Sequence, residues 1–128
     1  MNSGELFAQM VLVVDDEPEV RAVTARILRE DGFYVLEASS GSEALHQLVA
    51  DASDTALLVA DAVMPGMSGV ELAGEVHSLR PGVCVLLMSG QAESGRTDAH
   101  PEELLAKPFS EEQLLSAARR ALRSATAA

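Results

Sequence analysis

The stretch ALLVADAVMPGMSGVEL, residues 56–72, contains the pattern that decides the fold. Five apolar residues run directly into the carboxylate of Asp61, and a proline, two glycines and a helix-start signal follow. A continuous apolar run of this length is typical of a strand that is covered on both faces of a parallel sheet. Ligands of such sheets bind beyond the carboxyl ends of the strands. We therefore expect Asp61 to be the reactive group of this chain.

Four other short apolar runs are expected as strands, at 10–14, 33–38, 83–88 and 104–106. Apolar residues at helical spacing separate most of these runs, and S-x-x-E or S-x-x-Q capping-box signals stand at 40–43, 68–71 and 110–113. This alternation predicts an α/β fold, a flavodoxin-like (βα)5 doubly wound parallel sheet with strand order 2-1-3-4-5. The helical stripes that we expect to face its core include Val23, Val49 and Leu79.

The segment 89–103 interrupts this regularity. It contains Gly90, Gly95 and Pro101, and it has no apolar residue larger than alanine. A crossover between parallel strands needs about a dozen residues at minimum, so little room remains for a helix. We expect the fourth helix to be short or disordered.

The 128 residues are enough for one domain with a sizeable core, which we assign to 10–123. Residues 1–9 are expected to be a lead-in or linker, and 124–128 a C-terminal tail. The net charge of −11 argues against direct binding of nucleic acid, which requires clustered basic residues. No apolar run approaches the ~20 residues of a membrane span, and the lone Cys84 fits a reducing compartment, so we expect a cytoplasmic protein without a membrane segment.

Acidic residues follow two of the expected strands, and the predicted strand order places those two strands side by side. Asp15 and Asp16 come after the first strand, and Asp61 comes after the third. Three carboxylates that are held together repel one another, and burial makes their ionisation still more costly. A hard divalent cation with oxygen ligands would relieve this repulsion, and Mg²⁺ usually completes its shell with water and phosphate oxygens. The pattern therefore indicates phosphoryl chemistry.

Two further polar residues are expected at strand ends. Lys107 is the only lysine among nine basic residues and follows the fifth strand. Its ammonium could pair with a carboxylate or with a phosphoryl oxygen. Ser89 follows the fourth strand and adds a hydroxyl donor.

Each of these residues also has a simpler interpretation. The acidic pair Asp15-Asp16 could be a solvated loop that assists the start of a helix. Asp61 and Ser89 could be ordinary turn residues, and Lys107 could be a surface lysine. Because all of these residues are expected at one edge of the sheet, a functional site is the favoured interpretation.

In this combination, the chain resembles the receiver domains of two-component response regulators from Met10 to Arg123. The matching residues are the acidic pair at 15–16, Asp61 in D-x-x-M-P-G-M-S-G, Ser89-Gly90, and Lys107-Pro-Phe. The resemblance implies that Asp61 accepts a phosphoryl group from a phosphohistidine of a sensor histidine kinase or a phosphotransfer protein. It further implies that Lys107 neutralises the transferring group, and that Ser89 then binds the acyl phosphate and switches the surface for an unknown downstream effector.

The metal site is also implied by this resemblance. Mg²⁺ would be held by Asp15, Asp16, Asp61 and the backbone carbonyl of Val63. The family commonly has an aromatic residue three positions before the lysine, where this chain has Leu104. We expect a monomer or weak dimer that is a signalling module and not an enzyme, either free-standing or as the receiver of a hybrid sensor kinase.

Two other functions remain open at this level. One is a Mg²⁺-dependent phosphatase with an aspartyl nucleophile, of the haloacid-dehalogenase type. That class needs a second aspartate two residues after the first, where this chain has Val63. The other is a pseudo-receiver that binds partners without being phosphorylated.

Overall fold

The computed structural model describes residues 9–50, 54–90 and 103–127. These residues form five strands and four helices. The strands are β1 (Met10–Val14), β2 (Tyr34–Ala38), β3 (Thr55–Asp61), β4 (Cys84–Ser89) and β5 (Glu103–Ala106). The helices are α1 (Pro18–Glu30), α2 (Gly41–Ala50), α3 (Gly69–Leu79) and α4 (Glu111–Ala127).

All five strands are parallel, and they lie in the order β2-β1-β3-β4-β5. The predicted fold class and strand order are confirmed. The expectation of a short or disordered fourth helix falls on 91–102, which lie outside the described residues. The proposed domain limits, 10–123 with flanking segments 1–9 and 124–128, stay a prediction.

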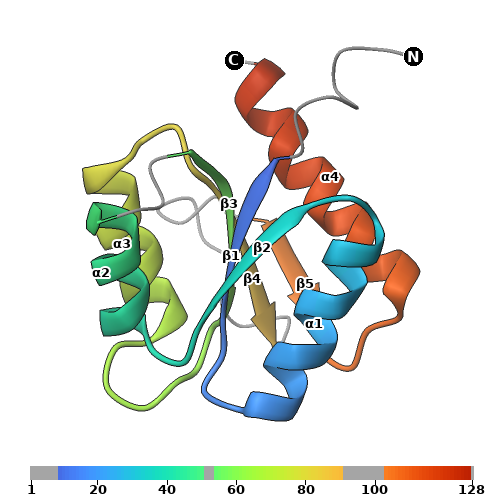
Figure 1. The fold of residues 1–128 in the computed structure, drawn as a ribbon, viewed down its shortest axis with the longest axis horizontal. Coiled ribbons are helices and arrows are strands. Elements are labelled where there is room, and N and C mark those ends of the chain that lie inside the picture. The colour runs from blue at the N-terminus through green and yellow to red at the C-terminus, as the bar shows by residue number, and fades with distance from the viewer. Residues whose placement is uncertain (1–8, 51–53, 91–102, 128) are drawn as a thin grey trace.

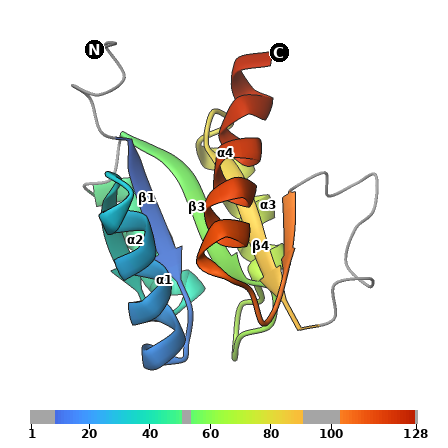
Figure 2. The same cartoon turned by 90° about the vertical axis from the view of Figure 1, so that its right-hand side faces the viewer.

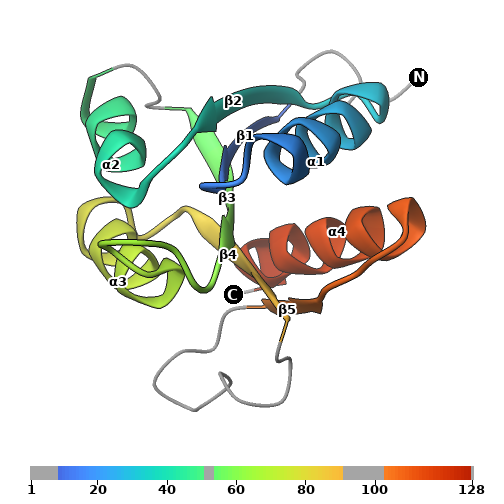
Figure 3. The same ribbon diagram turned by 90° about the horizontal axis from the view of Figure 1, so that it is seen from below.

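The helices form two layers on the sheet. Helices α1 and α4 cover one face, whereas α2 and α3 cover the other (Figures 1 and 3). The carboxyl ends of the strands share one edge of the sheet, at the bottom of Figures 1 and 2. No helix in the described part of the chain is long and apolar enough to cross a membrane.

Strand β1 shows why the apolar runs are continuous. Its side chains alternate between the two faces of the sheet, as in any strand. Val11 and Val13 pack in the core with α1 and α4, whereas Leu12 and Val14 pack in the core with α2 and α3. Because both faces are covered, both sets of side chains must be apolar.

Three residues that were expected to face the core are exposed instead. Val23, Val49 and Leu79 retain 46%, 68% and 49% of their accessible surface. Their neighbours on the same helices, Ile27, Leu48 and Val76, are buried, so each helix buries a narrower face than its apolar stripe. The helical period alone therefore overestimates the buried face.

The capping signals at 68–71 and 110–113 form complete capping boxes, with both reciprocal hydrogen bonds present. The signal before α2 works differently. Ser40 Oγ accepts a hydrogen bond from the Glu43 N–H at 3.1 Å, but the Glu43 carboxylate accepts from the backbone N–H and the hydroxyl of Ser39. The backbone hydrogen bond from Ser39 lowers the pKa of Glu43.

Strand β2 is an edge strand, as the expected strand order implied. Two outward-facing carbonyls of this edge accept hydrogen bonds from side chains. Arg29 Nη2 donates to the Val35 carbonyl at 2.9 Å, and Gln47 Nε2 donates to the Glu37 carbonyl at 3.0 Å. These bonds occupy backbone groups that could otherwise pair with another strand.

Candidate functional site

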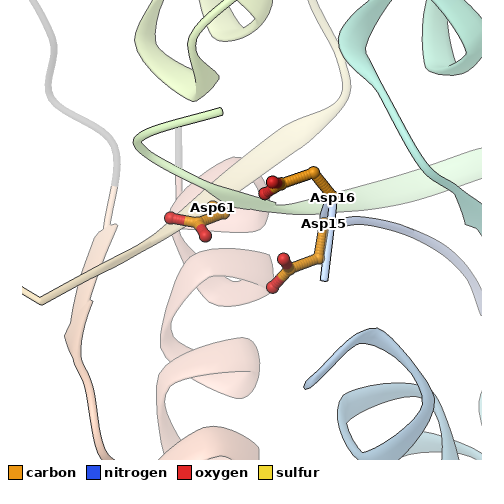
Figure 4. Close-up of side chains that lie close together, drawn as sticks. All are labelled: Asp15, Asp16 and Asp61. Atoms are coloured by element: carbon orange, nitrogen blue, oxygen red, sulfur yellow. The ribbon is translucent and has the colours of Figure 1, made fainter. Parts of the chain in front are cut away.

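Two neighbouring strand ends bring three carboxylates together. Asp15 and Asp16 follow β1, and Asp61 is the last residue of β3, the strand that pairs with β1. One oxygen of each lies within 4.8 Å of the others (Figure 4). We call these three residues the carboxylate cluster. The structure therefore places the expected acidic residues at one point.

The carboxylates differ in their burial. Asp15 is fully buried and Asp61 is 8% exposed, whereas Asp16 is exposed. Asp15 Oδ1 accepts a hydrogen bond from the Glu17 N–H at 2.9 Å. Among the described residues, Asp15 Oδ2 has no hydrogen-bond donor. Burial raises the pKa of Asp15, which means that its ionised form is held at a cost in free energy.

Lys107 is the cation of the site. Its Nζ lies 3.0 Å from Asp61 Oδ2 and 3.6 Å from Asp15 Oδ2. Burial by itself lowers the pKa of Lys107, but the hydrogen bond to Asp61 and the nearby acidic charges outweigh burial, so the net pKa is raised. The ammonium therefore stays charged, yet it can offset only one of the three negative charges.

The carboxylate cluster fits a small hard cation. Its donors are carboxylate oxygens, which Mg²⁺ prefers, and one of them, Asp15 Oδ2, is buried without a hydrogen bond. Its nearest cation, the Lys107 ammonium, is 3.6 Å away and also pairs with Asp61, so a divalent ion would lower the cost of keeping this buried oxygen ionised. Asp16 lies on the exposed side, which leaves room for water and for a phosphoryl oxygen.

The other expected site residues lie close to this cluster. Ser89 ends β4, is partly buried, and its carbonyl accepts a hydrogen bond from the Lys107 N–H at 2.9 Å. The Val63 N–H donates to Asp61 Oδ1 at 3.2 Å, while the Val63 side chain is 78% exposed. The roles expected for the Ser89 hydroxyl and for the Val63 carbonyl stay predictions.

Leu104 lies three positions before Lys107, where the resemblance noted above commonly places an aromatic residue. It pairs with Leu87 of the neighbouring strand and packs, partly buried, against the core beneath α2 and α3. The side chain at this position is therefore apolar but has no ring.

Sequence reasoning missed two residues that support the site. A β-carbon on Gly69 would lie only 2.2 Å from the Asp61 carbonyl oxygen, and the Gly69 N–H donates to the Ala62 carbonyl at 3.0 Å. The sequence marks Gly69 only as a helix start. Arg21 donates to the Asp15 carbonyl at 2.8 Å, and nothing in the sequence distinguishes it from the other seven arginines.

A family model described as the response regulator receiver domain matches residues 11–119. The chain belongs to this family. Receiver domains of this kind are signalling modules of two-component systems, which is the class that the resemblance implied.

Two curated relatives show the settings of such receiver domains. The sensor kinase CckA of Brucella abortus is 37% identical over 108 residues, which is 81% of this chain and 11% of that protein. The response regulator MprA of Mycolicibacterium vanbaalenii is 34% identical over 120 residues, which is 91% of this chain and 51% of that protein. The chain therefore spans about half of one relative and a small part of the other.

Solved receiver structures share the fold. The receiver domain of the hybrid histidine kinase CckA is 35% identical with a TM-score of 0.74, covering 88% of this chain and 98% of that one. The response regulator TrrA of Thermotoga maritima, solved in complex with Mg²⁺-BeF, is 29% identical with a TM-score of 0.78. That alignment covers 89% of this chain and 99% of TrrA.

Proposed function

We propose that this receiver domain is a phosphoacceptor and that Asp61 carries the phosphoryl group. The observation that supports this most is the position of the Lys107 Nζ, 3.0 Å from Asp61 Oδ2 and 3.6 Å from Asp15 Oδ2. A carboxylate that is paired with an ammonium, at the carboxyl end of a buried strand, is available as a nucleophile. The donor we propose is a phosphohistidine on a sensor histidine kinase or on a phosphotransfer protein.

In the transfer, an Asp61 oxygen forms a bond to phosphorus as the bond between phosphorus and the imidazole nitrogen breaks. The imidazole leaves with the electron pair of that bond, and Asp61 becomes an acyl phosphate. Lys107 pairs with Asp61 before the transfer and can follow the new negative charge onto the phosphoryl oxygens afterwards. Such transfers depend mainly on positioning and on electrostatic stabilisation.

Asp15, Asp16, Asp61 and the Val63 carbonyl are the proposed holders of Mg²⁺. When bound, the ion supplies the positive charge that neutralises the transferring group and the negative oxygens around it. The chain's own carboxylates contribute by orienting these charges, while the buried side of the site excludes water from Asp15.

Phosphorylation would change the surface through Ser89. We propose that the Ser89 hydroxyl donates a hydrogen bond to the acyl phosphate and that its strand end moves with it. The Lys107 N–H is bonded to the Ser89 carbonyl, so the ends of β4 and β5 are mechanically connected. A partner that prefers the shifted arrangement would then bind more tightly after phosphorylation.

The test is incubation of the protein with Mg²⁺ and either acetyl phosphate or a phosphorylated histidine kinase. We expect mass spectrometry to find one phosphoryl group on Asp61 that is stable in mild acid and labile in base. Asp61→Asn is the control and should remain unmodified. An unmodified wild type, under conditions that label another receiver domain, would contradict the proposal. Repeated turnover of small phosphomonoesters would instead support the phosphatase function.

A further inference from the structure

Arg21 connects the loop of the carboxylate cluster to a separate ion-pair network. Its Nη1 donates to the carbonyl oxygen of Asp15 at 2.8 Å, and its Nε donates to Glu37 Oε1 at 3.3 Å. Arg29 lies two turns further along the same helix and donates to Glu37 Oε2 at 3.1 Å. We call Arg21, Arg29 and Glu37 the Glu37 cluster. Of its two arginines, Arg21 is the one that bonds to the backbone of the acidic loop.

The backbone of Asp15 is held from both sides. Its N–H donates to the Ala38 carbonyl of β2 at 3.2 Å, while its carbonyl accepts from Arg21 of α1. The peptide unit between Asp15 and Asp16 is planar, so holding that carbonyl also sets the direction of the next N–H. The orientation of the Asp16 backbone therefore depends on the guanidinium of Arg21.

This constraint is important because the two acidic residues are held differently. Asp15 is buried in the core, where packing limits its side chain. Asp16 is exposed, yet its carboxylate must point toward Asp15 and Asp61 for the cluster to form. Loops turn more freely than buried strands, so an exposed ligand needs a backbone that is already oriented.

We propose that Arg21 is a positioning residue for the metal site, acting through the Asp15 carbonyl without touching the ion. This inference rests on the proposed function, because it requires Mg²⁺ at the carboxylate cluster. Glu37 assists by holding the Nε side of the same guanidinium, and the planar arrangement of its donors lets Arg21 bond to both acceptors at once.

Charge and geometry predict opposite outcomes for the loss of Arg21. A guanidinium near a cation site repels Mg²⁺, so its removal would strengthen binding if charge alone mattered. If Arg21 orients the loop, its removal weakens binding, and the loss of such an outer partner typically costs about 10–100-fold in metal affinity. The sign of the change therefore separates the two explanations.

The experiment is a Mg²⁺ titration of the ¹⁵N-labelled protein, followed through the amide signals of residues 15–17. We expect Arg21→Ala to weaken Mg²⁺ binding about tenfold and to shift the Asp16 and Glu17 amides even without Mg²⁺. Arg29→Ala is the matched control, because Arg29 carries the same charge on the same helix and also pairs with Glu37. It should change the affinity less than about twofold, since the acidic loop stays anchored.

Arg21→Lys provides a second variant that keeps the charge and disturbs folding less. A single ammonium cannot match the planar guanidinium that bonds to both the Asp15 carbonyl and Glu37. We therefore expect a Mg²⁺ affinity between those of wild type and Arg21→Ala. Unchanged or tighter binding in Arg21→Ala, or equal losses in Arg21→Ala and Arg29→Ala, would overturn the positioning role. A wild type that binds no Mg²⁺ would overturn the metal site and this role together, whereas phosphorylation of Asp61 is tested separately.

Discussion

The carboxylate cluster and the Glu37 cluster are two groups of charged residues with opposite balances. In the Glu37 cluster, two guanidiniums surround one carboxylate, and both oxygens of Glu37 have a donor, at 3.3 and 3.1 Å. In the carboxylate cluster, one ammonium lies 3.0 Å from Asp61 and 3.6 Å from Asp15, and the buried Asp15 Oδ2 has no hydrogen bond from the described residues. The first network is complete within the chain. The second keeps an excess of negative charge among the described residues, which a cation from outside would neutralise.

The largest effect should come from removing a ligand of the proposed metal. Loss of an outer partner of a metal ligand costs about 10–100-fold in affinity, so Asp15→Asn should weaken Mg²⁺ binding by more than about 100-fold. Titration calorimetry measures this affinity directly. Glu37→Gln removes one negative charge from the other cluster and should leave the affinity within a few-fold of wild type. Equal losses in both variants would mean that overall charge, and not the site, attracts the ion.

The next largest effect is expected for Lys107→Ala, which should slow the phosphorylation of Asp61 while leaving the fold intact. Removal of one preorganised donor from a reacting group commonly slows a reaction about 100-fold, and we expect that loss in the rate of Asp61 phosphorylation. The rate is measured by mass spectrometry at saturating Mg²⁺, and folding by circular dichroism. Arg26→Ala, which breaks the exposed pair with Glu30, is the control and should react normally. A normal rate in Lys107→Ala would exclude the role we assign to it.

Gly69→Ala should reduce stability. The added β-carbon would meet the Asp61 carbonyl at 2.2 Å and the Ala62 Cα at 2.8 Å, so the backbone must shift. Overpacking of this kind typically costs about 1–3 kcal/mol in the free energy of unfolding. Gly74→Ala is the control on the same helix, because nothing lies within 4 Å of its β-carbon position. It should be neutral or slightly stabilising, as alanine favours helices more than glycine does. Equal stability of the two variants would show that the loop next to Asp61 yields easily.

The ionisation of Asp15 should have a smaller effect on the stability of the metal-free protein. The folded-state pKa of Asp15 is raised above the ordinary value of 3.8, so its stabilising contribution is present below that pH and is lost as pH rises through the raised pKa. At pH 7 with a chelator, Asp15→Asn should therefore be more stable than wild type, and the gap should close toward pH 3.

Urea unfolding of wild type and Asp15→Asn at several pH values checks this expectation. The lowered pKa of Glu43 makes both proteins less stable as the pH falls, which is opposite to the effect of Asp15. Because Glu43 is present in both proteins, its contribution cancels in the difference between them. A wild type that is the more stable protein at pH 7 without metal would contradict the raised pKa. Added Mg²⁺ should stabilise wild type and have little effect on the variant.

Breaking the Glu37 cluster should cause the smallest change in the stability of the protein. Its side chains are between 20% and 50% exposed, and ion pairs of this kind rarely contribute more than about 1 kcal/mol. Glu37→Gln should therefore lower the free energy of unfolding by less than about 1 kcal/mol, and less still at high salt. Thermal unfolding at low and high ionic strength measures it. A larger loss would mean that this network stabilises the fold more than its exposure indicates.

Much of the fold could be predicted because the strands are buried on both faces. Runs such as 10–14 and 56–60 have no polar residue until the strand ends, and this marks both the strand and its end. The same signal located Asp15, Asp16 and Asp61, since a carboxylate directly after such a run can only lie at the edge of the sheet. The exposure of Val23 and Val49 could not be predicted in this way. Helical spacing shows which residues share a face of the helix, but it does not show how much of that face is covered by the sheet.

The sequence by itself determined the alternation of strands and helices, the strand ends and the types of residue found there, because local burial and turn chemistry are properties of short segments. Only the tertiary structure decided which oxygen of Asp15 lacks a donor, how Gly69 approaches the Asp61 carbonyl, and that Arg21 bonds to the Asp15 carbonyl and to Glu37. These features join elements that are distant along the chain. They depend on distances of a few ångströms between packed elements, which no periodicity in the sequence encodes.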